Sequence, residues 1–245
     1  MSISSAILLA FMSTTEAVMT LLNSPSACSP ERYAEARGLV EDEAAKGQPL
    51  QQFLIGVMAT NHARAKRYLE VSRPKIQWLA AEKNNPLAWY LLSVERNEMR
   101  LLRAAARGGN VQALNALGTI ATQEIMRKTG ASTNEVARVL KQSFAYFERA
   151  AAQNDANGFV NLGACYLNGL GCERDLPMAF TCFKTAADLG HPEGMDSLAA
   201  AYALGHGVEK DMEKSAVWRM RAKAVRGDEA ARKWIEDRKR LKDGK

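Results

Sequence analysis

Several features that mark common protein classes are scarce in this sequence. Its 245 residues include only 7 Pro and 4 Cys. The cysteines are Cys28, Cys165, Cys172 and Cys182, and no two of them form a Cys-x-x-Cys pair. So few cysteines in a chain of this length do not make a disulfide scaffold, and their spacing is not that of a zinc site. We therefore expect reduced thiols and no bound metal or cofactor.

Long apolar runs are missing as well, since no segment reaches the roughly 18 apolar residues that a membrane-spanning helix needs. Residues 6–12 form a short apolar run, but no Lys or Arg precedes it, as a secretion signal would require. The apolar residues there recur instead at the spacing of an amphipathic helix, as Ile3, Ile7, Leu8, Phe11, Val18, Met19 and Leu22. We expect a cytoplasmic protein, and export with residues 1–28 acting as a signal is the alternative.

The positive charge is confined to one end of the chain. The formal net charge is +6, and residues 219–245 contain 11 Lys and Arg against 5 Asp and Glu, a surplus equal to the whole net charge. The preceding 218 residues are therefore balanced. A basic end suits nucleic acid or an anionic membrane surface. It also suits a capping helix with a basic tail, which we favour because acidic residues interrupt the run and an end repeat needs a polar outer face.

What the sequence does have is a repeated loop. Gly169, Gly171 and Asp175 return 36 positions later as Gly205, Gly207 and Asp211. Dinucleotide-binding and phosphate-binding loops need a third Gly or a Gly-Lys-Ser/Thr sequence, and neither follows here. A loop that recurs at a fixed period indicates a structural repeat instead.

Helical periodicity surrounds this loop and no β-strand alternation is visible. Residues 156–167 are periodic, Asp175 is a candidate N-cap, Pro177 fits a first helical turn, and Gly190 fits a helix end. Similar segments occur earlier at a period of about 45 and, more faintly, back to residue 44. We predict an all-α fold, a right-handed α-solenoid of antiparallel helix hairpins. Its expected parts are degenerate repeats at 1–85, a solenoid at 86–227, and a capping helix with a basic tail at 228–245.

The complete signature resembles the Sel-one-like repeat, a relative of the tetratricopeptide repeat. It consists of Leu-Gly-x-x-Tyr, then Gly-x-Gly-x-x-x-Asp, then a helix that ends in Ala-Ala and a Gly; the matching residues are Leu162, Gly163, Tyr166, Gly169, Gly171, Asp175, Ala186, Ala187 and Gly190. The next unit departs from the pattern, with Ala199 in place of the Gly. A secreted branch of the family bridges its repeats by disulfides, but Ala187 and Met195 occupy those positions here. The resemblance implies a protein-binding adaptor without catalysis.

No constellation of residues points to an enzyme. The three histidines, His62, His191 and His206, lie at predicted turns without the spacing of metal ligands. Cys165 and Cys182 fall on helix positions that indicate a core, where cysteine is usually inert. We therefore expect neither catalysis nor a small-molecule substrate.

A row of arginines is the best candidate for a binding site. Arg96, Arg100, Arg103 and Arg107 are spaced by 4, 3 and 4 residues, so we expect them to share one helical face. They form either a solvated outer face or a basic ridge that grips the carboxylates of an acidic partner. The loop residue Arg174 is a lesser candidate.

We therefore predict a non-enzymatic module, adaptor or scaffold, that binds one or more protein partners on the solenoid surface. The sequence does not separate this role from that of a dedicated inhibitor, such as an immunity or chaperone-like protein for one toxin or effector. Binding of nucleic acid or an anionic membrane surface by the basic C-terminal helix is the remaining alternative.

Overall fold

The computed structural model describes residues 30–46, 63–82, 84–96 and 98–242, and the regular elements of these segments are all helices. They fall into two compact units, and the chain passes from one to the other between Asn110 and Val111. The structural division therefore lies at residue 110, and the three-part division at residues 85 and 227 stays a prediction. The amphipathic helix expected near the N-terminus, Cys28 and His62 lie outside the described residues.

Unit 1, the part before Val111, contains four described helices: α3 (Pro30–Ala45), α5 (Ala63–Ala81), α6 (Pro86–Arg96) and α7 (Met99–Arg107). α5 packs against α6, and α6 packs against α7. Leu91, Leu101 and Ala105 are buried in this part of the chain. Only two residues separate α6 from α7, fewer than in the loops that join the helices of other hairpins.

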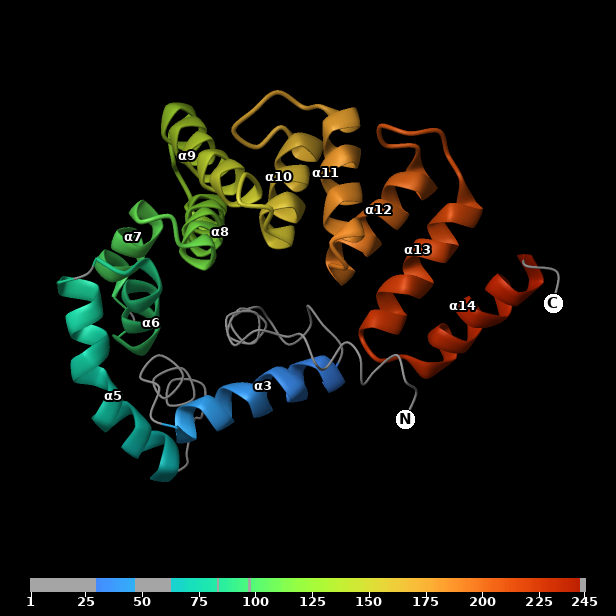
Figure 1. The fold of residues 1–245 in the computed structure, drawn as a ribbon. Helices are drawn as coiled ribbons and strands as arrows, with labels where there is room; N and C mark the ends of the chain where they lie inside the picture. Colours follow the sequence, from blue (N-terminus) through green and yellow to red (C-terminus); the bar gives the residue numbers. More distant parts are fainter. Residues whose placement is uncertain (1–29, 47–62, 83, 97, 243–245) are drawn as a thin grey trace. The chain divides into compact units, whose positions relative to one another are not determined.

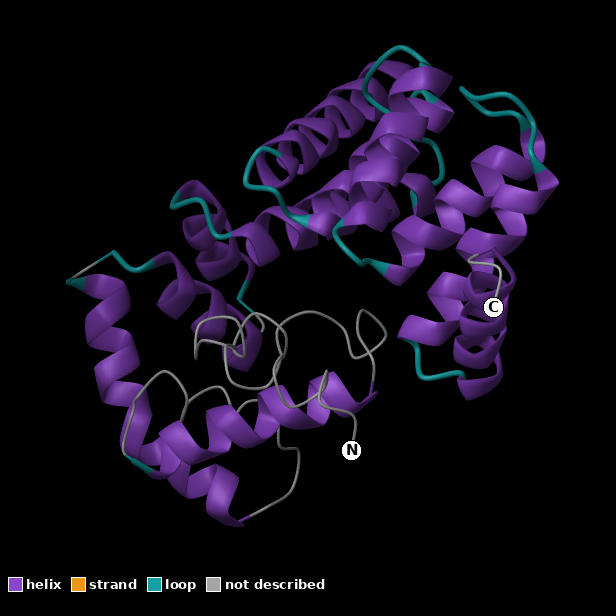
Figure 2. Ribbon diagram, turned by 45° about the vertical axis from the view of Figure 1, so that its right-hand side comes forward, coloured by secondary structure: helices purple, strands orange, loops and turns teal. Residues whose placement is uncertain are grey.

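Unit 2 is a row of helix hairpins, which follow one another in the ribbon (Figures 1 and 2). The hairpins are α8 (Val111–Arg127) with α9 (Thr133–Ala151), α10 (Ala156–Asn168) with α11 (Leu176–Asp188), and α12 (Pro192–Leu204) with α13 (Met212–Val225); α14 (Glu229–Lys242) follows. Each helix packs mainly against its neighbours in the sequence. This confirms the predicted all-α solenoid of helix hairpins, in which each repeat buries its apolar face against the next.

A phenylalanine of the second helix packs onto a glycine of the first helix inside each of the first two hairpins. A Cβ atom at Gly118 would lie 2.5 Å from the Phe147 ring, and one at Gly163 would lie 2.6 Å from the Phe183 ring. The glycine of the Leu-Gly pair therefore leaves the space that this ring occupies. The third hairpin has Arg219 at the position 36 residues after Phe183, so Ala199 replaces the glycine without a clash.

The Gly-x-Gly-x-x-x-Asp loop reverses the chain between the two helices, as predicted. Asp175 and Asp211 are N-caps whose carboxylates accept hydrogen bonds from the backbone N–H of Met178 (2.9 Å) and Lys214 (2.8 Å). Gly171 and Gly207, which have φ of 78° and 73°, press against the backbone of the preceding hairpin. A Cβ atom there would overlap the carbonyl oxygen of Leu140 or Leu176, respectively, so the second glycine also sets the distance between hairpins.

The joints between hairpins repeat the same aromatic contact. Phe144 of α9 meets Tyr166 of α10 edge to face at 5.5 Å, and Phe180 of α11 meets Tyr202 of α12 in the same way at 5.4 Å. Such pairs add to the stability that burial provides. The equivalent tyrosines, Tyr166 and Tyr202, are therefore structural.

Candidate functional site

The predicted arginine row is divided between two helices. α6 ends at Arg96, and α7 begins at Met99 after the extended backbone of Glu98 (φ −100°, ψ 108°). The expectation that all four arginines share one helical face is therefore wrong for Arg96, because the helix is interrupted between it and the others. The side chain of Arg96 lies outside the described residues, whereas Arg100, Arg103 and Arg107 are exposed on α7.

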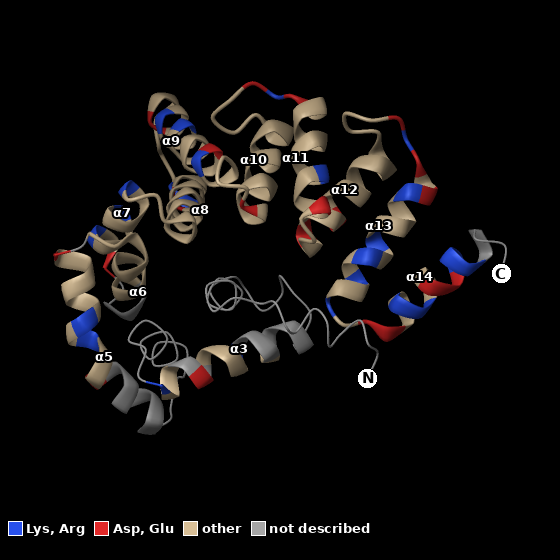
Figure 3. Cartoon of the chain, in the orientation of Figure 1, with Lys and Arg blue, Asp and Glu red and all other residues tan. Residues whose placement is uncertain are grey.

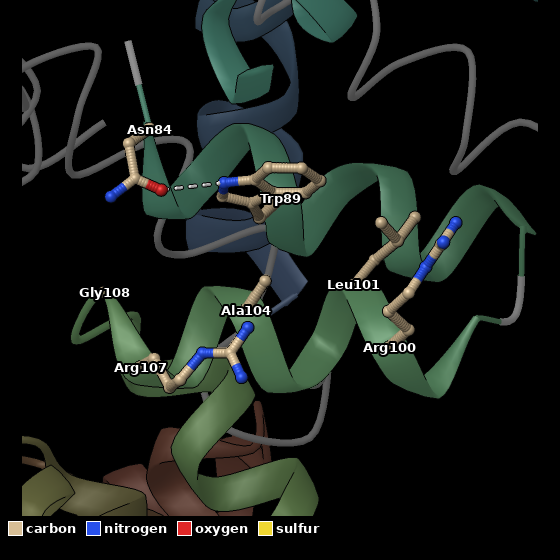
Figure 4. A pocket seen from close by; sticks show the side chains of 7 residues that line it. All are labelled: Asn84, Trp89, Arg100, Leu101, Ala104, Arg107 and Gly108. Atoms are coloured by element: carbon tan, nitrogen blue, oxygen red, sulfur yellow. Dashed lines mark hydrogen bonds between the residues drawn. The ribbon is translucent and has the colours of Figure 1, made fainter. Parts of the chain in front are cut away.

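A cavity of about 540 Å³ opens between α6 and α7, and two of these arginines line it. Its walls are formed by Asn84, Trp89, Arg100, Leu101, Ala104, Arg107 and Gly108. Figure 4 shows Trp89 on α6 with Asn84 beside it, and Arg100, Leu101, Ala104 and Arg107 along α7. The Trp89 indole N–H donates a hydrogen bond to the Asn84 side-chain oxygen at 3.2 Å, which fixes the ring beside the cavity.

The electrostatics of this cavity are positive. Arg100 pairs with Glu98 at 3.2 Å, but its side chain is 82% exposed, so water screens the pair. Arg107 forms no ion pair with any acidic residue that the structure describes. Arg103 is exposed on α7 but does not line the cavity. A guanidinium at each end and an indole in the wall suit an acidic segment that also carries apolar surface.

Arg174, the lesser candidate, lies in the loop between α10 and α11. Its Nε donates to the carbonyl of Leu167 at 2.9 Å, so part of this side chain holds the loop in place. Leu167 also lines a second cavity, of about 160 Å³, whose walls are Leu167, Ala179, Phe180, Phe183, Ser197, Ala200, Ala201, Leu204 and His206. The structure therefore places Arg174 beside an apolar cavity of unit 2.

The basic C-terminal helix is partly neutralised by its own contacts. Lys and Arg alternate with Asp and Glu along α14 (Figure 3). Arg238 pairs with Glu213 of α13 and its guanidinium stacks 5.2 Å from the Trp234 ring, while Arg226, just after α13, binds Asp196 at 2.7 Å. The contact of Arg238 with Glu213 joins α14 to α13, and the capping role expected for residues 228–245 stays a prediction. None of the described helices is long and apolar enough to cross a membrane, and the expected compartment stays a prediction.

The three described cysteines are free thiols in one region of unit 2. Burial raises the pKa of Cys165 to about 12 and that of Cys182 to about 11. Burial also raises the pKa of Cys172, which is less enclosed. A raised pKa leaves the thiol protonated and therefore a poor nucleophile near neutral pH. Within the described segments no three His, Cys, Asp or Glu side chains gather as a metal site would require.

His191 is structural and caps α12. Its Nδ1 accepts from the backbone N–H of Gly194 at 3.4 Å, and its Nε2 lies 3.0 Å from Asn157 Oδ1. These contacts fit the neutral ring with its proton on Nε2. Burial lowers the pKa of His191, although the charges of Glu193 and Asp155 oppose this effect. The aspartate at the equivalent position, Asp155, caps α10 and accepts from Asn115 at 2.7 Å.

Sequence reasoning missed Trp89 and Asn84, and it missed the unit 2 cavity. Trp89 lies 11 residues before Arg100 and 18 before Arg107, and only the packing of α6 on α7 brings them together. The second cavity did leave a signal in the sequence. Ala201 and His206 stand 36 positions after Cys165 and Leu170, so the repeat comparison shows an exchange of core residues there.

The fold and the repeated loop define a class, the α-solenoids of short helix hairpins. The family model of the Sel1 repeat matches residues 111–155, 160–191 and 192–218. These residues therefore form Sel1 repeats. Sel1 repeats are generally protein–protein interaction modules without catalytic activity.

Two solved structures are similar to this chain. A Sel1 repeat protein from Oxalobacter formigenes has 25% sequence identity and a TM-score of 0.52, and the match covers 83% of this chain and 60% of that one. The second is a protective antigen of uropathogenic Escherichia coli with an SLR fold, with 22% identity, a TM-score of 0.48, and coverage of 76% and 40%. This chain thus spans less than two thirds of either protein. No curated protein matches the sequence.

Proposed function

We propose that this chain is an adaptor or scaffold without catalytic activity, and that it binds a partner protein through an acidic segment. The observation that carries the proposal is the cavity between α6 and α7, where Arg100 and Arg107 stand at the rim and Trp89 forms a wall. Arginine and tryptophan, together with tyrosine, are enriched among the residues that dominate protein–protein binding.

The chemistry of the rim favours carboxylates over other groups. A guanidinium offers paired donors that match the two oxygens of Asp or Glu, and the positive rim would steer an acidic segment toward the cavity. Leu101 and Ala104 lie between the two arginines along the wall, so an apolar side chain of the partner finds cover there. Arg103 adds charge on the same helix, and Arg96 and Arg174 remain predicted contributors.

The test is affinity capture from native extract, followed by mass spectrometry and a binding titration with each protein captured. We expect R100E/R107E to lose binding by about 100-fold, since two charge-assisted contacts become repulsive. R138E/R219E, at two exposed positions of unit 2, changes the net charge equally and should bind like the wild type. Equal binding by wild type and R100E/R107E would reject this site.

A charge-conserving variant separates geometry from charge. R107K keeps the positive charge but loses the paired donors, so we expect a loss of about three- to tenfold with an unchanged response to salt. Recovery of one tightly bound partner in equimolar amount with this chain would identify the chain as a dedicated inhibitor, such as an immunity or chaperone-like protein. Several weaker partners would identify a scaffold.

A further inference from the structure

The joint between α11 and α12 follows the skeleton of the joint between α9 and α10. The edge-to-face ring pairs, Phe144–Tyr166 and Phe180–Tyr202, stand 36 positions apart and have centroid distances of 5.5 Å and 5.4 Å. The Asp175 and Asp211 backbone N–H groups bind the carbonyls of these tyrosines, both at 2.9 Å. Residues of the two joints can therefore be compared position by position.

The filling of the two joints differs at two positions. Cys165 is buried in the first joint, with 3% of its surface exposed, and Leu170 packs against the same core cluster. The equivalent residues of the second joint are Ala201 and His206, and both line the 160 Å³ cavity. The exchange of Cys for Ala and of Leu for His therefore coincides with the cavity.

At the mouth of the cavity the exchange between the two joints replaces a polar side chain with an apolar one. Asn168, which is polar and bonds back to the Ala164 carbonyl at 2.9 Å, is replaced by Leu204. Leu204 lines the cavity with 64% of its surface exposed. The second joint has thus lost apolar filling inside and gained an apolar side chain at the opening, which is the pattern of a site that receives a side chain from outside.

The size of the cavity limits what enters it. A cavity of about 150 Å³ holds one benzene ring, so 160 Å³ fits one leucine or phenylalanine side chain. Phe180 and Phe183 in the wall favour such an apolar group.

Cationic residues stand at equivalent positions of the two loops beside the cavity. Arg174 is held to the carbonyl of Leu167, a wall residue. Lys210 lies over Gly205, between the wall residues Leu204 and His206, where a Cβ atom on the glycine would be 3.8 Å from the Lys210 Cβ. Both side chains are exposed, and the described acidic residues, including the adjacent Glu173 and Glu209, form no ion pair with either of them.

We propose that this cavity is an anchor site for an extended peptide segment of a partner protein. One Leu or Phe of the segment fills the cavity, and an Asp or Glu one or two residues away binds Arg174, with Lys210 as the second cation. This inference rests on the proposed protein-binding function but places a separate contact on unit 2. The occupant is a partner peptide rather than a second copy of this chain, because Arg174 and Lys210 form no ion pair with the described acidic residues and therefore favour an acidic ligand from outside.

The residues of the first joint indicate which substitutions should close the cavity in the second joint. A201C/L204N/H206L gives the second joint the residues of the first, so it should fold with equal or higher thermal stability. A display library of random 12-residue peptides is selected on the full chain, and the enriched peptides are synthesised and titrated against the wild type and the variants. We expect enriched peptides to share a Leu or Phe next to an acidic residue.

The selected peptides should lose affinity about 10- to 100-fold on A201C/L204N/H206L, because one apolar side chain is no longer buried. R174A should cost about threefold, as exposed ion pairs do. Replacing the peptide's Leu or Phe with Ala should reproduce the loss, which tests the cavity even if the triple variant fails to fold.

Three results would overturn the anchor site. One is enrichment of peptides without an apolar anchor, another is equal binding of these peptides to wild type and triple variant, and the third is self-association of the chain through this joint. Peptides that respond only to R100E/R107E would support the proposed function while rejecting the anchor site. Peptides that respond only to the triple variant would do the reverse.

Discussion

Two joints of unit 2, α9–α10 and α11–α12, have the same backbone contacts but different side-chain filling. Both keep the ring pair, the capping aspartate and the second loop glycine. Only the first fills its interior with Cys165 and Leu170, whereas the second has Ala201 and His206 beside a cavity. The comparison shows that the positions that define the repeat are distinct from those that determine whether a joint is closed.

The largest expected effect on stability comes from the second loop glycine, which both joints share. In G171A and G207A, a methyl group would overlap the backbone of the preceding hairpin at a positive φ, and backbone cannot move aside cheaply. We expect each variant to lower the free energy of unfolding by about 2–4 kcal/mol. Urea denaturation followed by circular dichroism measures the change.

G190A is the matched control for this prediction. Gly190 also has a positive φ, 85°, but a Cβ atom there would meet nothing within 4 Å. Its cost should be limited to backbone strain, about 1 kcal/mol. If G190A proved as damaging as G171A, close packing between hairpins would not be the reason for the second glycine.

The next largest effect on stability comes from the side chains that fill the interior of each joint. A201C/H206L should raise the free energy of unfolding by about 0.5–1.5 kcal/mol, because it fills the cavity with the residues of the other joint. The reciprocal change, C165A/L170H, should lower it by about 2–4 kcal/mol, since it opens a filled core. Thermal unfolding of both variants tests the exchange, and opposite signs are required. A loss of stability in both would mean that the joints are not equivalent.

The smallest expected effect is on the pH dependence of stability, and it comes from the different residues that cap α10 and α12. Asp155 caps α10 and His191 caps α12, and burial lowers the pKa of His191 below 6.5. The unfolded chain therefore binds more protons than the folded chain below about pH 6.5, so stability should fall as the pH decreases through that value. Urea unfolding between about pH 5 and pH 7.5 measures the slope.

H191N supplies the comparison for the pH effect, because Asn is also a good N-cap and does not titrate. We expect the pH dependence of stability to be weaker in H191N than in the wild type. An unchanged slope would assign the effect to groups other than His191.

Much of the fold was predictable because its signals are local. Asp175, Pro177 and the loop glycines determine helix ends through their own backbone preferences, and the period of 36 carries these signals from one hairpin to the next. The break between α6 and α7 was not predictable from the arginine spacing, since the row continues across it. The two cavities depend on side chains brought together by packing, although the exchange at Ala201 and His206 is visible in the aligned repeats.

The most direct test of the protein-binding role compares nuclease-treated captures by two full-length chains, the wild type and K233E/K239E/R240E. The three substituted residues are exposed on α14, so this helix should remain folded. Recovery of the same stoichiometric protein partner by both chains is the predicted result. Binding that disappears with nuclease or with the charge reversal on α14 would contradict it and assign the function to the basic C-terminal helix.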